Sequence, residues 1–257
     1  MSAAAEMDPI RVERLTSGVR VVTIDRPPVN ALRFADLADL DTAFAEIAAD
    51  DAARCVVITG AGQRAFLAGT DLAELTALTA DTADVQLEIV KRLVARVAGM
   101  PVPVICALNG PALGSGVAIV ACADIRVAAP RGALQLPEVD VGVMGGARHL
   151  ARILPQGAVR LAMYTGRRIG AEELYRLGAV DLLVGQDELL PRALELAEEI
   201  AGKPAVAIRY AKRAFDLTEE LPLAEAYRLE CELTAALRRE PEAVEAGKRY
   251  MARIAKR

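Results

Sequence analysis

One stretch of the sequence, Val97 to Ala123, contains no charged residue, although 26% of the whole chain is charged. A stretch of this length without charge is long enough to cross a bilayer as a helix. Prolines and glycines interrupt it, however, and a helix broken inside lipid would leave backbone groups without hydrogen-bond partners. We therefore interpret the stretch as a buried unit of a globular core and expect no membrane association.

The uncharged stretch divides into three pieces. Its sequence predicts a buried strand over Val104–Leu108, a tight glycine-rich turn over Asn109–Gly116 and a buried helix over Val117–Cys122. Glycine lets backbone N–H groups approach a ligand closely, and the first turn of a helix carries N–H donors that lack intrahelical partners. The turn is therefore a candidate site for negative charge, and a turn that binds nothing is the alternative.

The composition of the 257-residue chain bounds the class of protein. Hydrophobic residues make up 53% of it, which is enough for one large core or a domain with a small appendage. The net charge of -4, the lack of a basic tract and the absence of Trp argue against nucleic-acid binding. The first ten residues have neither the basic head nor the apolar core of an export signal, so we expect a cytoplasmic protein.

The cysteines and the single histidine argue against a metal site. Cys55, Cys106, Cys122 and Cys231 form no CxxC pair and lie in apolar sequence. We expect reduced core thiols rather than disulfides or metal ligands. His149 is the one histidine, which excludes any site that needs two.

Short apolar strands alternate with helical patterns in the first half of the chain, which predicts α/β layering. The second half is mostly helical. We expect a core over residues 1–187, ending in a strand over 180–184, and a C-terminal helical region over 188–257. The other expected elements are a hairpin of 10–15 with 19–24, strands 55–59, 125–128 and 133–136, and helices 35–49, 82–98, 147–154, 158–165, 171–177, 188–201, 205–217, 222–238 and 241–255.

Two glycine loops follow two predicted buried strands, one over Gly60–Thr70 and one over Asn109–Gly116. If the strands are neighbours, each loop can direct a backbone N–H at one point, which is the arrangement that an oxyanion requires. Glu138 lies in an apolar, turn-like segment, where partial desolvation would raise its pKa toward values useful in proton transfer. The alternative is that Glu138 or Asp140 caps a helix that begins near Gly145.

Two other site types fit the sequence poorly. A serine hydrolase would use Ser115, His149 and an Asp, but Leu113 stands where a nucleophile elbow has glycine. A dinucleotide-binding turn would need glycine where the chain has Ile119.

Several short motifs together resemble the crotonase superfamily, the enoyl-CoA hydratase/isomerase family. They are Asn30-Ala31-Leu32, Val57-Ile58-Thr59-Gly60, residues 65–72, residues 104–110, Gly114-Ser115-Gly116, residues 123–126, Pro137-Glu138, residues 164–169 and residues 177–180. The resemblance implies a crotonase-like spiral of ββα units with a C-terminal trimerisation region, assembled as a homotrimer or a hexamer. It also implies an acyl-CoA thioester substrate and no separate cofactor, since coenzyme A is part of the substrate.

The resemblance also implies roles for particular residues. The backbone N–H groups of Thr70 and Ser115 match the oxyanion hole of the family, and Glu138 matches an acid/base glutamate. Ala31, Ala68, Thr70 and Leu72 match the segments that contact CoA.

One departure from the family pattern affects the expected reaction. Hydratases of the family hold a water between two glutamates; the second matches Glu138, but the position of the first is Ala118. We therefore favour double-bond isomerisation through an enolate, with Glu138 as the only acid/base. The alternatives are hydration of a 2-enoyl-CoA and a catalytically weak CoA-binding homologue.

Overall fold

The computed structural model describes residues 8–255, apart from the side chains of residues 80 and 81. Its strands are β1 (Ile10–Arg14), β2 (Val19–Ile24), β3 (Cys55–Gly60), β4 (Val104–Leu108), β5 (Pro111–Leu113), β6 (Ile125–Ala128), β7 (Ala133–Gln135), β8 (Arg168–Gly170) and β9 (Leu182–Leu183). Its helices in the first half are α1 (Phe34–Ala48), α2 (Leu72–Thr76), α3 (Ala80–Ala98), α4 (Ser115–Cys122) and the 3-10 helix η1 (Pro137–Val141). The second half adds α5 (Ala147–Leu150), α6 (Gln156–Thr165), α7 (Ala171–Arg176), η2 (Gln186–Glu188), α8 (Leu189–Ala201), α9 (Ala205–Thr218), α10 (Leu223–Leu237) and α11 (Pro241–Ile254).

The strands form two sheets. The larger has the order β1-β2-β3-β4-β6-β9, and the smaller has the order β5-β7-β8. The predicted hairpin of β1 and β2 is antiparallel, and every other neighbouring pair in the larger sheet is parallel. The predicted α/β layering is therefore confirmed. The strand predicted over 180–184 joins the sheet as the shorter β9, and the structure places it beside β6.

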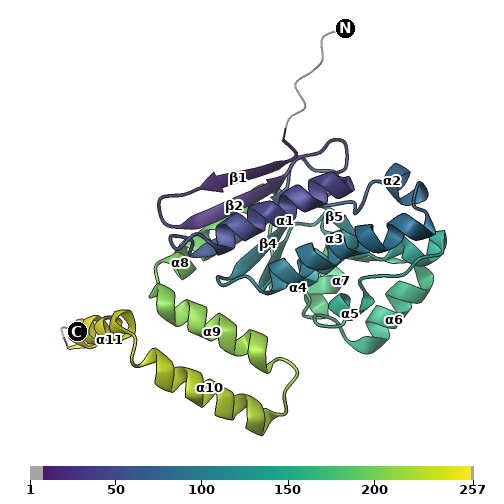
Figure 1. Ribbon diagram of the computed structural model, residues 1–257. Helices are drawn as coiled ribbons and strands as arrows, with labels where there is room; N and C mark the ends of the chain where they lie inside the picture. The colour runs from purple at the N-terminus through teal and green to yellow at the C-terminus, as the bar shows by residue number, and fades with distance from the viewer. Residues whose placement is uncertain (1–7, 256–257) are drawn as a thin grey trace.

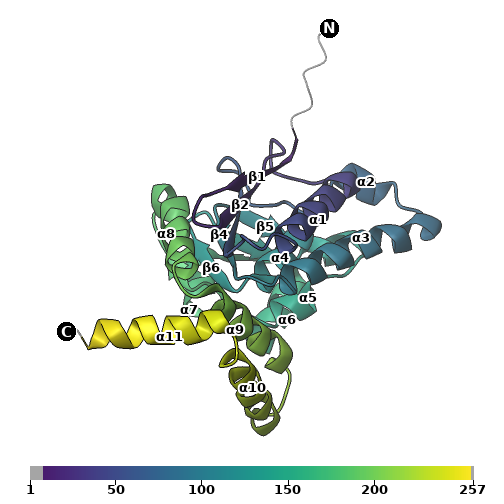
Figure 2. The same ribbon diagram turned by 60° about the vertical axis from the view of Figure 1, so that its left-hand side comes forward.

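The central strands of the larger sheet, β3 and β4, are buried on both faces. In β3, Val56 and Ile58 pack into the core beneath α1 and α3, whereas Cys55 and Val57 pack on the opposite face against α8. Figure 2 shows α8 on one side of the sheet and α1 with α3 on the other. Because alternate residues of a strand point to opposite faces, burial on both sides explains why β3 and β4 read as continuous apolar runs.

The structure resolves the question raised by the uncharged stretch. Its pieces are the buried strand β4, the short strand β5 and the buried helix α4, all inside the core. Within residues 8–255, no helix combines the length and apolar composition that a bilayer crossing requires.

Three expectations need correction. The predicted turn Asn109–Gly116 contains the strand β5, and α4 begins at Ser115 rather than Val117. The pairing of β5 with β7 supplies hydrogen bonds that its three residues cannot make locally. Cys231 is exposed on α10, so only Cys55, Cys106 and Cys122 are core thiols; all four cysteines are free.

The helices α9, α10 and α11 extend away from the layered core, with α9 and α10 side by side (Figure 1). The helix α9 is held to the core by Lys212, whose Nζ lies 3.0 Å from Asp124 Oδ1 and 3.3 Å from Asp216 Oδ1. Lys212 is only 6% exposed. Burial raises the pKa of the Asp216 carboxyl, although the Lys212 charge opposes this effect.

We expect Lys212→Met to lower the free energy of unfolding by about 2 kcal/mol, because it leaves partly buried carboxylates without their cation. Urea denaturation would measure the loss. Lys203→Met is the matched control, since Lys203 is half exposed and lies 3.6 Å from Glu199. Equal stability of the two variants would contradict a role for Lys212 in docking α9.

Candidate active site

Two loops leave the larger sheet at the same edge. The strands β3 and β4 are parallel neighbours, so the loop after β3 and the segment after β4 begin side by side. They remain together: the Leu113 N–H donates to the Leu67 carbonyl at 2.9 Å. Gly69 lies so close to Leu113 that an added Cβ would be 3.0 Å from the Leu113 carbonyl oxygen. The structure therefore brings the two predicted N–H segments, around Thr70 and Ser115, next to each other.

The first segment is fixed by a parallel bridge between Leu32 and Thr70. The Leu32 N–H donates to the Gly69 carbonyl at 2.9 Å, and the Asp71 N–H donates to the Leu32 carbonyl at 2.8 Å. In a parallel bridge, one residue makes both hydrogen bonds, and it makes them to the two neighbours of its partner. Here Leu32 bonds Gly69 and Asp71, so Thr70 uses neither its N–H nor its carbonyl in the pairing. The Thr70 N–H therefore faces away from Leu32 and is free of this pairing.

The second segment is the start of α4. Gly114 is the N-cap residue with φ 54°, a left-handed conformation that favours glycine, and Ser115 is the first residue of the helix. An N–H in the first turn has no intrahelical acceptor, and it lies at the positive end of the helix dipole. The Ser115 N–H has the properties that an anion site requires.

Glu138 lies on η1 and faces the N-cap of α4. A Cβ added to Gly114 would lie 3.0 Å from Glu138 Oε1, so the carboxylate lies directly against the N-cap of α4. Among the described residues, Glu138 Oε2 is buried and has no hydrogen-bond partner. Burial raises the pKa of the Glu138 carboxyl, and a hydrogen bond from its own backbone only partly opposes this. The alternative in which Glu138 caps the next helix is wrong, because Gly146 is the N-cap of α5.

The position of the missing glutamate is apolar in the structure. Ala118 lies one turn after Ser115 on α4 and is 4% exposed, among core residues. The other carboxylate of η1, Asp140, points elsewhere: its Oδ2 would be 2.8 Å from a Cβ added to Gly166 at the end of α6. Within η1, Glu138 is therefore the carboxylate that faces the N-cap of α4.

The residues predicted to contact CoA come from two adjacent loops. Ala31 precedes the bridge residue Leu32, and Ala68 precedes Gly69. Leu72 is the first residue of α2 and is 62% exposed. These residues border the Thr70 segment, and their contacts with CoA stay a prediction.

Sequence reasoning missed how the two loops are anchored. Asn30, 3% exposed with φ 55°, donates from Nδ2 to the carbonyls of Ala61, Ala65 and Phe66. Asn109 accepts from the Gly60 N–H at 3.1 Å. Both asparagines are buried. A polar amide next to apolar residues in the sequence was the feature from which these anchoring roles could have been predicted.

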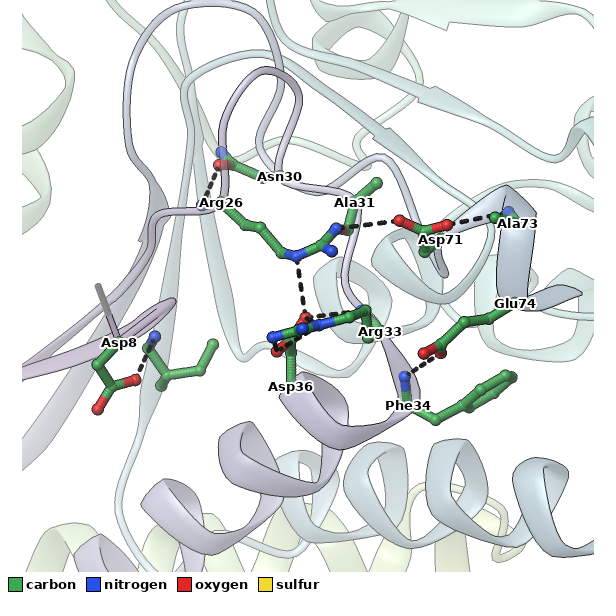
Figure 3. Close-up of polar contacts among 11 residues, drawn as sticks. Asp8, Arg26, Asn30, Ala31, Arg33, Phe34, Asp36, Asp71, Ala73 and Glu74 are labelled. Atoms are coloured by element: carbon green, nitrogen blue, oxygen red, sulfur yellow. Dashed lines mark hydrogen bonds and ion pairs between the residues drawn. The ribbon is translucent and has the colours of Figure 1, made fainter. Parts of the chain in front are cut away.

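Arg26 was also missed; its guanidinium joins Ala31, Asp36 and Asp71 (Figure 3). The signal for Arg26 is weaker than that for the asparagines, because arginine is common in loops.

Two other expectations concern reactive groups. Ser115 Oγ is buried without a hydrogen-bond partner among the described residues, so His149 does not bond it and the serine-hydrolase reading fails. Burial raises the pKa of the Cys106 thiol to about 12, as expected for an unreactive core residue. In the part of the chain that the structure describes, no group of three or more His, Cys, Asp or Glu could hold a metal ion.

Comparison with known proteins defines the family. The family model for enoyl-CoA hydratase/isomerase matches residues 14–254. The chain is 36% identical over 208 residues to YngF of Bacillus subtilis, whose name assigns it to the enoyl-CoA hydratases/isomerases; the match covers 79% of this chain and 80% of YngF. It is also 36% identical over 210 residues to a carnitinyl-CoA dehydratase of Escherichia coli, covering 80% of each chain.

Solved structures agree with the sequence relatives. A crystal structure of an enoyl-CoA hydratase from Bacillus anthracis superposes with a TM-score of 0.91 at 30% identity, covering 95% of this chain and 96% of that one. An enoyl-CoA hydratase from Mycobacterium smegmatis gives a TM-score of 0.90 at 27% identity, covering 95% and 96%. The chain thus has the crotonase-like α/β fold with C-terminal helices. It belongs to the enoyl-CoA hydratase/isomerase family of the crotonase superfamily, whose members are enzymes that act on CoA thioesters.

The buried carboxyl of Glu138 has a consequence for stability. A glutamate whose pKa is raised by folding binds its proton more tightly in the native state, so its ionisation weakens the fold as pH rises through that pKa. We expect Glu138→Gln, which cannot ionise, to have a melting temperature about 2 °C above wild type at pH 8. The difference should vanish near pH 4, where the unfolded carboxyl is also protonated.

Differential scanning calorimetry across this pH range would test the expectation. Asp140→Asn is the control, because Asp140 is an exposed carboxylate of the same 3-10 helix. A melting temperature for Glu138→Gln below wild type at pH 8 would contradict a desolvated Glu138.

Proposed function

We propose that the protein shifts the double bond of an enoyl-CoA thioester, with Glu138 as its only acid/base. The observation that carries the proposal is the approach of Glu138 Oε1 to Gly114, at the N-cap of the helix that begins with Ser115. A carboxylate beside a helix N-terminus joins a proton acceptor to a site for negative charge.

In the proposed reaction, the Glu138 carboxylate removes a proton from C2 of a 3-enoyl-CoA. The electron pair of the C–H bond moves into the carbonyl, and the thioester oxygen becomes the anion of a dienolate. The N–H groups of Thr70 and Ser115 hold that oxygen, and they bind it more strongly as its charge grows. The carboxylic acid of Glu138 then returns the proton to C4, which gives the 2-enoyl-CoA.

The burial of Glu138 supports this role. Its raised pKa makes the carboxylate a stronger base than an exposed glutamate. The reaction changes no oxidation state, so we propose that it needs no cofactor beyond the CoA of the substrate.

The proposed binding residues follow the two loops. We propose that Ala31, Ala68, Thr70 and Leu72 contact CoA. Exposed apolar side chains near the candidate site offer a surface for the acyl group: Leu72, Val141, Val143 and Met144, of which Met144 is 81% exposed. Free core thiols are consistent with a protein of the cytoplasm.

A second candidate function is hydration or dehydration, which the name of the 36%-identical carnitinyl-CoA dehydratase favours. Ala118 argues against it, because a methyl group cannot hold a water or carry a proton. A catalytically weak CoA-binding protein is the third possibility.

Turnover assays would separate these functions. We expect wild type to convert a 3-enoyl-CoA to its 2-enoyl isomer faster than it hydrates crotonyl-CoA, both followed by the absorbance of the conjugated thioester. Glu138→Gln should lower the isomerisation kcat by about 10²- to 10⁴-fold, the usual contribution of one acid/base group. Asp140→Asn should stay within about threefold of wild type, because Asp140 faces Gly166.

Faster hydration than isomerisation by wild type would overturn the isomerase proposal in favour of a hydratase. Binding of acyl-CoA without turnover of either substrate would leave the weak binding protein as the function.

We further propose that α9, α10 and α11 assemble the protein as a homotrimer or a hexamer. These helices expose large apolar side chains: Phe215, Leu217, Leu223, Tyr227, Val244, Tyr250, Met251 and Ile254. Exposed apolar surface of this kind is typical of protein–protein interfaces.

Sedimentation equilibrium should give three or six times the 27.3 kDa chain mass. Phe215→Asp, at a position 76% exposed, should lower that mass by placing a charge in the interface. A monomeric wild type would contradict the proposal.

A further inference from the structure

Two loops carry the proposed CoA contacts and the first oxyanion donor. The first loop joins β2 to α1 over residues 25–33, and the second joins β3 to α2 over residues 61–71. Their main chains meet at one place, where Leu32 pairs with Gly69 and Asp71 on either side of Thr70. The direction of the Thr70 N–H therefore depends on how firmly the first loop holds the second.

Two side chains of the first loop reach the second: Asn30, which donates to carbonyls at its start, and Arg26, which reaches its end at Asp71. Arg26 Nη1 donates to the Ala31 carbonyl of the first loop and to Asp71 Oδ2 of the second, the latter at 3.1 Å. Its Nε lies 3.1 Å from Asp36 Oδ2 in the first turn of α1. Figure 3 shows the guanidinium between these three groups.

The partners of Arg26 are themselves fixed. Asp71 is the N-cap of α2, where its Oδ1 accepts from the Ala73 N–H at 2.9 Å. The Asp36 side chain is 2% exposed and accepts from the Arg33 N–H at the start of α1. Arg26 thus connects the first turns of two helices across the loops that they follow.

A second contact reinforces the same junction. Glu74 Oε2 of α2 accepts from the Phe34 N–H, the first residue of α1, at 2.6 Å. The start of α2 is thus tied to the start of α1 twice, once through Arg26 and once through Glu74.

The charges indicate that Arg26 is not a phosphate ligand. Two carboxylates, Asp36 and Asp71, face its guanidinium, and its side chain is 27% exposed. The hydrogen bond from Arg26 lowers the pKa of the Asp71 carboxyl below its ordinary value. Burial raises the pKa of Asp36, but the hydrogen bonds from Arg33 and the charges of Arg33 and Arg26 outweigh this, and the net shift is downward. Both carboxylates are therefore held ionised. They neutralise the positive charge of Arg26 that would otherwise attract a phosphate group.

We infer that Arg26 is a positioning residue: by joining the Ala31 carbonyl to Asp71, it fixes the direction in which the Thr70 N–H meets the thioester oxygen. This inference rests on the proposed oxyanion role of Thr70. In this inference Arg26 acts through Ala31 and Asp71 and not by contact with the substrate. Small displacements of an oxyanion donor are costly, and one donor accounts for about 10²- to 10³-fold in rate.

The test separates oxyanion binding from CoA binding. Acetoacetyl-CoA forms an enolate whose near-ultraviolet absorbance reports how well the site stabilises the oxyanion, without any turnover. Free CoA reports only the CoA contacts. We expect Arg26→Gln to reduce the bound enolate fraction and the isomerisation kcat by about tenfold, with less than about a threefold change in the Kd of free CoA.

Two variants refine the test. Asp71→Asn keeps an oxygen to cap α2 but weakens the pair with Arg26, so it should reproduce most of the loss. The double variant of Arg26→Gln and Asp71→Asn should lose little more enolate signal and kcat than either single variant, since the two residues act through one contact. Arg11→Gln is the matched control, because Arg11 also pairs with an aspartate, Asp25, at 2.6 Å, but lies on β1; it should resemble wild type.

Three other outcomes would contradict either the role of Arg26 or the proposed function. A weaker Kd for free CoA with an unchanged enolate signal would make Arg26 a CoA ligand and overturn the inference. A lower melting temperature with both signals unchanged would reduce it to a structural residue. If wild type binds acetoacetyl-CoA without an enolate signal, the proposed function fails instead.

Discussion

The parallel pairing of β3 with β4 is the constraint on which the candidate site depends. Both strands are buried on their two faces, between α8 on one side and α1 with α3 on the other, so neither can shift in register without exposing apolar side chains. The loop after each strand consequently starts from a fixed position. The segments that carry Thr70 and Ser115 lie side by side because they follow these two strands.

Much of this arrangement could be predicted from the sequence, because burial leaves a strong pattern. The strands β3 and β4 read as short apolar runs, and α1 and α3 showed helical periodicity. The strands β5 and β8 could not be found, since each has three residues and exists only through pairing with β7. Cys231 was predicted to be buried, yet it is exposed on α10, which packs against α9.

The site itself was predicted less completely than the sheet. Motifs indicated Thr70, Ser115 and Glu138, but the contact of Glu138 with Gly114 joins residues distant in sequence. The roles of Asn30 and Arg26 as cross-loop anchors depend on main-chain acceptors, and carbonyl groups carry no sequence signal. An apolar Ala118, by contrast, was visible from the sequence, and the structure adds that no other carboxylate of η1 replaces the missing one.

The shielding of Glu138 Oε2 has a consequence for the path of the proton. An atom that solvent does not reach exchanges hydrogen with water slowly, and this oxygen also has no protein partner among the described residues to relay a proton. In the proposed isomerisation, a proton that Oε2 takes up from one carbon would therefore remain with the enzyme–substrate pair until it is returned. A hydrogen isotope placed at C2 would then be found at C4 of the same molecule instead of being lost to the medium.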